Sequence, residues 1–143
     1  MFRMGDLMLG VPSQNVREVT RMGPMTPLPR MASAVLGVVG HRGEVLPVVD
    51  LLRFLGVGEL KPSPRARIFV GIAGNLSAAF MADTVIGLRR VFTADIWPAP
   101  VTGQVPSELL LGIVTTDREG EGAINLLNLA RVLQSARQRA VVR

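Results

Sequence analysis

Short apolar runs alternate with small groups of turn-forming residues along the whole chain, at fairly regular intervals. Runs of about four to eight β-branched and aliphatic residues, bounded by Gly, Pro, Asn or Asp, are typical of β-strands. Such runs predict strands at 1–4, 7–11, 35–40, 45–50, 67–73, 78–85, 88–93, 109–115 and 123–127. The pattern therefore predicts an all-β barrel or sandwich.

Turn residues divide most of these runs into hairpins. The connections are Gly5-Asp6, the polar group around Arg42-Gly43, Gly74-Asn75 and the polar group around Asp117–Gly120. Glycine supplies the positive φ that tight hairpin turns need. Pro47 interrupts the second run of the Arg42-Gly43 hairpin, and it predicts a sheet edge or a bulge there because proline cannot donate to a ladder.

Three segments break the strand pattern. Pro12-Ser13 predicts a short helical turn with Ser13 as its cap and with Val16 and Val19 facing inward. Residues 22–31 contain three prolines and predict an irregular crossing. Leu51–Leu55 predicts one helical turn, which Asp50 caps and Gly56 ends.

The last segment changes period. Apolar residues recur at steps of three and four and predict one amphipathic helix at about 129–140. They are Leu126, Leu129, Val132, Leu133, Ala136 and Ala140. The arginines of this segment lie off the apolar stripe, which indicates a solvated face.

Composition narrows the class of protein. Hydrophobic residues make up 48% of the chain, yet every long apolar run is interrupted by charged, Gly or Pro residues. A membrane-spanning helix needs about 20 consecutive apolar residues, so we expect no direct membrane insertion. The opening residues also lack the apolar core of a signal peptide. The expected location is therefore cytoplasmic, with part of the apolar surface buried against partner proteins.

Candidate chemistry is sparse. The sequence has no Cys and a single histidine, His41. It also has no phosphate-binding glycine loop and no closely spaced carboxylate pair. We therefore expect no catalytic residues, no metal site and no cofactor, and we expect that the protein is not an enzyme.

The net charge of +5 opens one alternative, a nucleic-acid-binding β-barrel. The cations are almost all arginines, but they are scattered, and aromatic residues make up only 4% of the chain. Single-strand binding depends on aromatic stacking. We therefore expect no nucleic acid among the partners.

The order of motifs resembles the CheW-like family over essentially the whole chain. The densest match is His41–Leu51, which is similar to the family's Arg-Gly hairpin followed by Pro-Val-Val-Asp-Leu. Further matches are Phe2–Asp6, Gly10–Pro12, Val16–Val19, Met25–Pro29, Leu36–Val39, Phe80–Val85, Ile96–Pro100, Leu111–Val114 and Ile124–Leu129. Each motif alone is weak, but their number and order make the resemblance specific.

This resemblance implies two small SH3-like five-stranded barrels that share a core, followed by the C-terminal helix. The chain is expected to be a single domain over 1–143 that consists of two intertwined barrels, with an approximate divide near residues 60–66. The family implies a non-enzymatic scaffold that couples the cytoplasmic tip of chemoreceptors to the regulatory domain of a CheA-type histidine kinase. Other CheW-like proteins are further candidate partners. The alternative is an accessory member of the family that binds receptors or other coupling proteins but not the kinase.

The resemblance also suggests partner-binding residues. The candidates are Val16, Glu18, Arg42, Gly43, Phe80, Ala82 and Val85. Core packing is an equally good account of Val16, and a solvated turn is the alternative for Arg42-Gly43.

Three other residues have structural and functional interpretations. Asp83 interrupts an apolar run, so it is expected to lie at the surface or to be paired. His41 is interpreted as a tolerated residue of an exposed turn. Trp97, the only tryptophan, is either an interface anchor or part of the packing.

Overall fold

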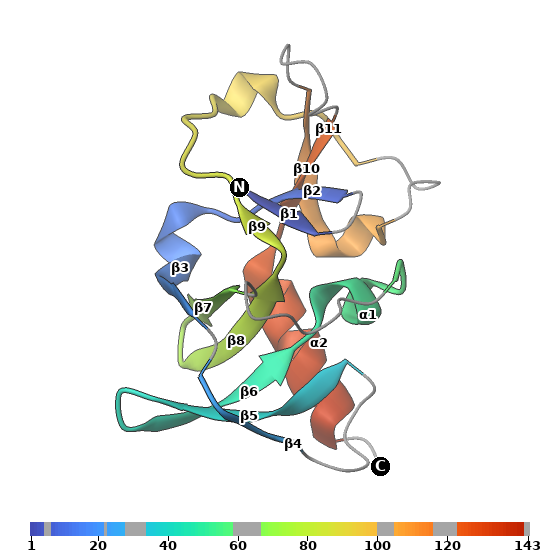
Figure 1. Ribbon diagram of the computed structural model, residues 1–143. Helices are drawn as coiled ribbons and strands as arrows, with labels where there is room; N and C mark the ends of the chain where they lie inside the picture. Colours follow the sequence, from blue (N-terminus) through green and yellow to red (C-terminus); the bar gives the residue numbers. More distant parts are fainter. Residues whose placement is uncertain are drawn as a thin grey trace.

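The computed structural model describes residues 1–4, 7–21, 23–27, 34–58, 67–99, 105–115 and 123–141. Its strands form two sheets, one above the other in Figure 1, with the C-terminal helix alongside the lower one. The predicted all-β class and the C-terminal helix are confirmed.

The five-stranded upper sheet combines the two ends of the chain. Its strands are β1 (Phe2–Met4), β2 (Leu7–Gly10), β9 (Thr84–Val85), β10 (Leu110–Thr115) and β11 (Ala123–Leu127), in the order β10-β11-β2-β1-β9. The predicted hairpins β1–β2 and β10–β11 both form, and β11 pairs with β2 in parallel.

The lower sheet has six strands, one more than expected. They are β3 (Val16–Arg21), β4 (Met25–Pro27), β5 (Val35–His41), β6 (Glu44–Val49), β7 (Arg67–Ala73) and β8 (Leu76–Ala82), in the order β3-β7-β8-β6-β5-β4. The extra strand β4 lies in the proline-rich crossing, where Met25 to Pro27 pair with β5. Proline is tolerated there because β4 is an edge strand.

Pro47 also lies where one side of its strand has no partner. It pairs with Val38 of β5, whereas the parallel pairing of β6 with β8 begins only at Val48. A missing N–H therefore costs no ladder hydrogen bond on the β8 side.

The helical segments are short except for the last. They are the 3₁₀ turns η1 (Ser13–Asn15), η2 (Thr93–Asp95) and η3 (Ser107–Leu109), and the helices α1 (Leu51–Leu55) and α2 (Leu129–Val141). The Asp50 carboxylate accepts hydrogen bonds from Leu52 N–H and Arg53 N–H, and α1 ends at Gly56 with φ 76°. Both predictions for α1 are confirmed, but Pro12 rather than Ser13 occupies the cap position of η1.

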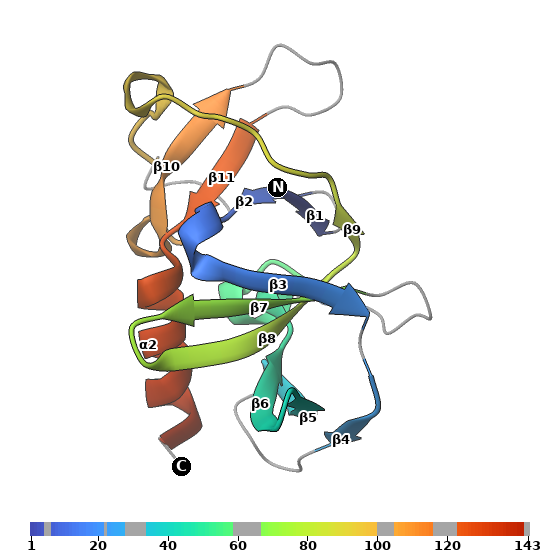
Figure 2. The same cartoon turned by 90° about the vertical axis from the view of Figure 1, so that its left-hand side faces the viewer.

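The chain changes sheets after β2 and again between β8 and β9. Figure 2 shows both crossings, where β2 leads into β3 and β8 into β9. The approximate division of the intertwined barrels expected near residues 60–66 stays a prediction. That segment falls outside the described residues, and strands on both sides of it, β6 and β8, pair in the same sheet.

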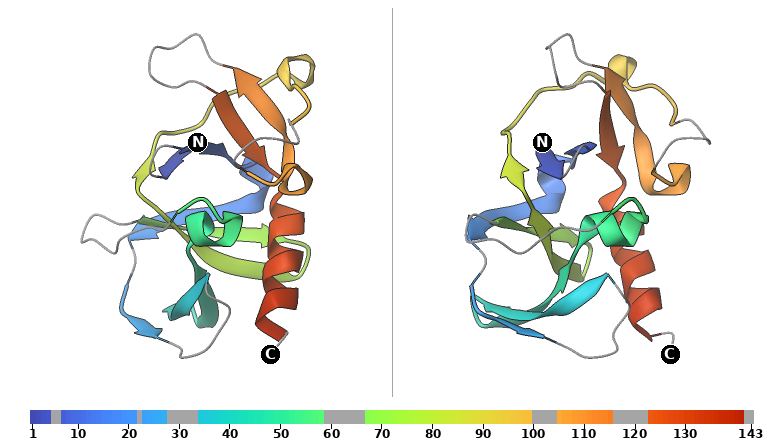
Figure 3. Two further views of the ribbon diagram at one scale, coloured as in Figure 1. Left: turned by 90° about the vertical axis from the view of Figure 1, so that its right-hand side faces the viewer. Right: turned by 45° about the vertical axis from the view of Figure 1, so that its right-hand side comes forward.

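A continuous core joins the two sheets. Phe2 of the upper sheet stacks on Phe69 of the lower sheet at a centroid distance of 4.4 Å, and Phe69 stacks on Phe80 at 5.1 Å. Helix α2 contacts β7 and β8 and buries Leu129, Val132 and Leu133 in the same cluster. Figure 3 shows α2 running down the side of the lower sheet.

Two strand predictions were wrong near the second crossing. The run 78–85 is split at Asp83, because β8 belongs to the lower sheet and β9 to the upper one. Residues 88–93 form no strand; residues 88–92 belong to a connection, and Thr93 begins η2. Val19, predicted to face inward from a helical turn, lies on β3 and is 41% exposed.

Candidate functional site

The β5–β6 hairpin ends in a two-residue turn made by Arg42 and Gly43. His41 pairs with Glu44 across the turn, and the φ angles of Arg42 and Gly43 are 50° and 80°. Positive φ at both central residues is typical of a type I′ turn, whose twist matches that of the strands. Arg42 is the only non-glycine residue with positive φ among the described residues. The sequence predicted this conformation for Gly43 but not for Arg42.

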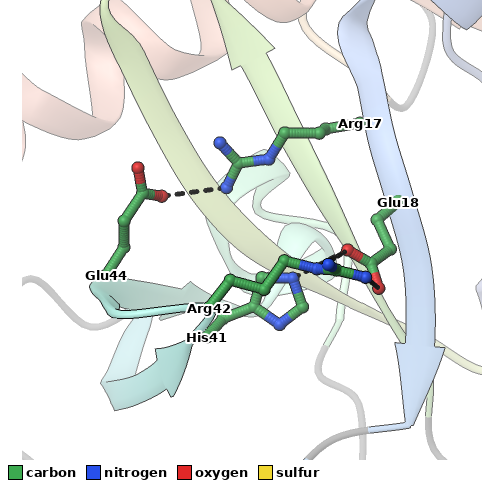
Figure 4. Close-up of polar contacts among 5 residues, drawn as sticks. All are labelled: Arg17, Glu18, His41, Arg42 and Glu44. Atoms are coloured by element: carbon green, nitrogen blue, oxygen red, sulfur yellow. Dashed lines mark hydrogen bonds and ion pairs between the residues drawn. The ribbon is translucent and has the colours of Figure 1, made fainter.

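The Glu18 carboxylate on β3 holds this turn in place (Figure 4). Arg42 donates two hydrogen bonds to it, from Nε to Oε2 at 2.9 Å and from Nη2 to Oε1 at 3.2 Å. His41 Nε2 lies 2.9 Å from the same Oε2. We call Glu18, His41 and Arg42 the Glu18 cluster. His41 is therefore a partner of Glu18 and not merely a tolerated turn residue.

A second ion pair joins the same elements. Arg17 Nη2 donates to Glu44 Oε2 at 2.9 Å. Neighbouring residues of a regular strand point to opposite faces, yet Arg17 and Glu18 both reach the hairpin. The reason is a register shift in the β3–β7 pairing between Val16 and Glu18, which leaves Arg17 as an extra residue. Bulges of this kind redirect side chains. Sequence reasoning missed the Arg17–Glu44 pair because nothing in the local pattern reveals the bulge.

The Glu18 cluster shifts two pKa values. The hydrogen bonds from Arg42 and then His41 lower the pKa of Glu18, because they stabilise the charged carboxylate. The hydrogen bonds that Arg42 makes with Glu18 raise the pKa of Arg42. Arg42 nevertheless keeps 73% of its side chain exposed, so much of it is accessible to a partner.

A small hollow opens next to β3, where the two sheets meet. It is lined by Val19, Arg67, Asp83, Thr84 and Val85, from both the upper and the lower sheet. Val85, a predicted partner residue, is 38% exposed here. Val19 was missed because its sheet position depends on the β3–β7 register and not on the helical turn that was predicted.

The remaining candidates lie elsewhere. Val16 is half-buried and packs against the main core. Phe80 and Ala82 are 0% and 1% exposed, so their prediction as partner-facing residues was wrong. Both lie on β8, which is covered by pairing with β7 and β6 and by contact with α2. An apolar motif in a strand did not distinguish a surface strand from this central one.

Trp97 combines a fixed backbone with an accessible side chain. Its N–H and C=O exchange hydrogen bonds of 2.8 Å with Ile113 of β10. The indole side chain is 64% exposed, which does not agree with burial in the core. Asp83 lies at the surface, which was one of the two arrangements expected for it.

Within the described residues, no three His, Cys, Asp or Glu side chains gather as metal ligands would. None of the described helices is both long and apolar enough to span a membrane. The geometry of the site is thus that of a charged turn clamped to a neighbouring strand, with a small hollow of mixed polar and apolar lining next to that strand. Such a mixed surface is suited to protein contacts.

The family model described as "CheW-like domain" matches residues 1–137. The chain belongs to the CheW-like family. It is 59% identical over 142 residues to "Protein FrzA" of Myxococcus xanthus, covering 99% of this chain and 88% of that protein. It is 36% identical over 99 residues to "Chemotaxis protein CheW" of Rhizobium meliloti, covering 69% of this chain and 64% of that protein.

A solved structure confirms the fold. The scaffolding protein TtCheW from Thermoanaerobacter tengcongensis superposes with a TM-score of 0.80 at 24% identity, covering 90% of this chain and 81% of that one. The resemblance to the CheW-like family and its two SH3-like β units are therefore confirmed, with β4 as an addition to the second unit. The expected role in chemotaxis-type signalling agrees with the names of these relatives.

Proposed function

We propose that this chain is a non-enzymatic adaptor that binds the cytoplasmic tip of a chemoreceptor and the regulatory domain of a CheA-type histidine kinase. Membership of the CheW-like family supports this proposal. The observation that carries it is the Glu18 cluster, which fixes an exposed arginine in one orientation at a hairpin tip. An arginine held by two hydrogen bonds is ordered before binding, so less side-chain entropy is lost when a partner docks.

The partner surface that we propose has two parts. The first is the turn Arg42-Gly43 with Glu18 behind it, and the second is the small hollow in which Val19 and Val85 lie beside polar side chains. β3, an edge strand of the lower sheet, lies between them, because its consecutive residues Glu18 and Val19 point to its two sides. We assign the receptor tip to this surface. Val16 contributes by packing beneath β3, whereas Phe80 and Ala82 support the surface from inside the core.

Calorimetric titrations test the proposal with two purified ligands from the same genome, a receptor tip fragment and the kinase regulatory domain. We expect micromolar binding of both by the unmodified protein. Arg42→Ala should weaken receptor binding by about tenfold or more, because it removes the charge at the tip and frees the turn from β3. The matched control is Arg131→Ala, which removes an exposed arginine of α2 outside this surface.

Each outcome has a defined meaning. Kinase binding that survives Arg42→Ala, together with loss of receptor binding, supports an adaptor with two separate surfaces. Receptor binding without kinase binding assigns the chain to the accessory class. Failure of the unmodified protein to bind either ligand contradicts the proposal.

A further inference from the structure

The upper sheet contains a large hollow far from the Glu18 cluster in the fold. It measures about 650 Å³ and is lined mostly by apolar side chains, among them Val11, Val91, Ile96, Ile124 and Leu126. Beneath it lies a small separate core of Met8, Val114 and Ile124. The hollow is therefore an apolar basin in the upper sheet and not part of the main core.

One wall of this hollow is the connection from β9 to β10. In Figures 1 and 2 this segment, coloured yellow, arches away from the sheet before it returns to β10. Its backbone is attached near its start, where Ile86 N–H donates to Met1 C=O, and at Trp97, which pairs with Ile113. The Met1 amino group also donates to the neighbouring Gly87 C=O at 2.8 Å, and further along the segment Asp95 N–H donates to Phe92 C=O and Ile96 N–H to Thr93 C=O within η2.

The rim of the hollow exposes an apolar surface. Leu88 of the β9–β10 connection and Leu111 of β10 line the hollow and are 91% and 50% exposed. Phe92 and Trp97, which lie further along the β9–β10 connection, are 66% and 64% exposed. Large aliphatic and aromatic side chains grouped on a surface mark sites of protein interaction. A single small amphiphile would fill the basin but leave Phe92 and Trp97 in water, so the complementary ligand is larger.

The charge at this rim is positive. Arg89 and Arg90 line the hollow, and its described lining includes no acidic residue. Both also border a smaller adjoining hollow, which holds Trp97 and one carboxylate, Asp95. The exposed Arg90 lines both hollows, and a cation at their shared rim favours an acidic ligand. A second copy of this chain is disfavoured, because its net charge is +5.

We propose that this groove binds an acidic amphipathic helix of a partner protein. Apolar side chains at steps of three and four along one face of that helix would occupy the basin between Leu88 and Leu111. Carboxylates beside this face would pair with Arg90. The groove lies on the upper sheet, whereas the Glu18 cluster lies on the lower one, so this contact is additional to the proposed adaptor surface.

The test uses a synthetic helical peptide with leucines at these steps, glutamates on both flanks and no tryptophan. Fluorescence anisotropy measures its binding, and the emission of Trp97, the only tryptophan, reports where it binds. We expect micromolar binding that shifts the Trp97 emission to the blue. Arg90→Glu and Leu88→Ser should each weaken binding about tenfold or more.

The control variant Arg131→Glu makes the same change in charge on α2 and should alter binding less than twofold, as should Arg42→Ala. Leu88 and Arg90 are exposed, so both groove variants are expected to fold, and circular dichroism verifies this. Equal binding of a peptide with lysines in place of glutamates would overturn the proposal, as would equal binding by the groove variants. Binding to phosphatidylglycerol vesicles without binding to the peptide would instead identify a membrane-surface site and also overturn it.

Discussion

Two residues, Gly43 and Glu18, control the geometry of the hairpin tip. Gly43 has φ 80°, a conformation in which a side chain clashes with the backbone. Gly43→Ala should therefore destabilise the protein by about 1–2 kcal/mol, measured by urea unfolding. The control is Gly40→Ala in the same hairpin, since Gly40 has no positive φ and a Cβ there meets no atom within 4 Å. Equal losses in the two variants would contradict the argument from φ.

Glu18 makes the stability of the protein depend on pH. Because folding lowers the pKa of Glu18, the folded state binds fewer protons than the unfolded state. Its contribution is complete above the unfolded pKa and is lost as the pH falls through the folded pKa. Glu18→Gln should therefore lose less stability than the unmodified protein when the pH is lowered from neutral through this range, measured as urea midpoints. Glu108→Gln, which removes a carboxylate outside the cluster, should follow the unmodified protein; parallel curves for all three would contradict this role of Glu18.

At the scale of elements, helix α1 depends on its N-terminal cap, Asp50. Asp50 is fully buried and accepts hydrogen bonds from Leu52 N–H and Arg53 N–H at 3.1 and 3.3 Å. Asp50→Ala should cost about 1–2 kcal/mol, because it leaves these donors without the cap oxygen. Asp50→Asn keeps a cap oxygen and should lose less in the same chemical unfolding experiment. An Asn variant as unstable as the Ala variant would show that the charge, and not the cap, is what matters.

At the scale of the whole molecule, the two sheets exchange segments and share one core. Phe2 stacks on Phe69 across the sheets, and the chain crosses between them twice. Neither sheet can unfold without exposing apolar surface of the other, so we expect the molecule to unfold as one domain. Trp97 fluorescence reports the upper sheet and far-ultraviolet circular dichroism reports the whole molecule. The two urea transitions should coincide, and two separate midpoints would mean that the sheets unfold independently.

Local features of the sequence determined most of the elements. Gly43 and Gly74 fixed the two hairpin turns that the structure describes, and Asp50 and Gly56 fixed the ends of α1. The period of Leu129, Val132 and Leu133 predicted α2. These signals depend on neighbouring residues, whose chemistry is visible in the sequence. The order of motifs also identified the family, and with it the two β units and the candidate turn Arg42-Gly43.

Only the tertiary structure decided which strands share a sheet, and therefore which residues face a partner. Strands on both sides of residues 60–66, β6 and β8, pair with each other, and local patterns carry no information about such pairing. Phe80 proved to be core and Val19 surface for the same reason: register and sheet order set burial. The bulge at Arg17 likewise brought Arg17 and Glu18 to one hairpin, because the shift in register with β7 turned both side chains towards it.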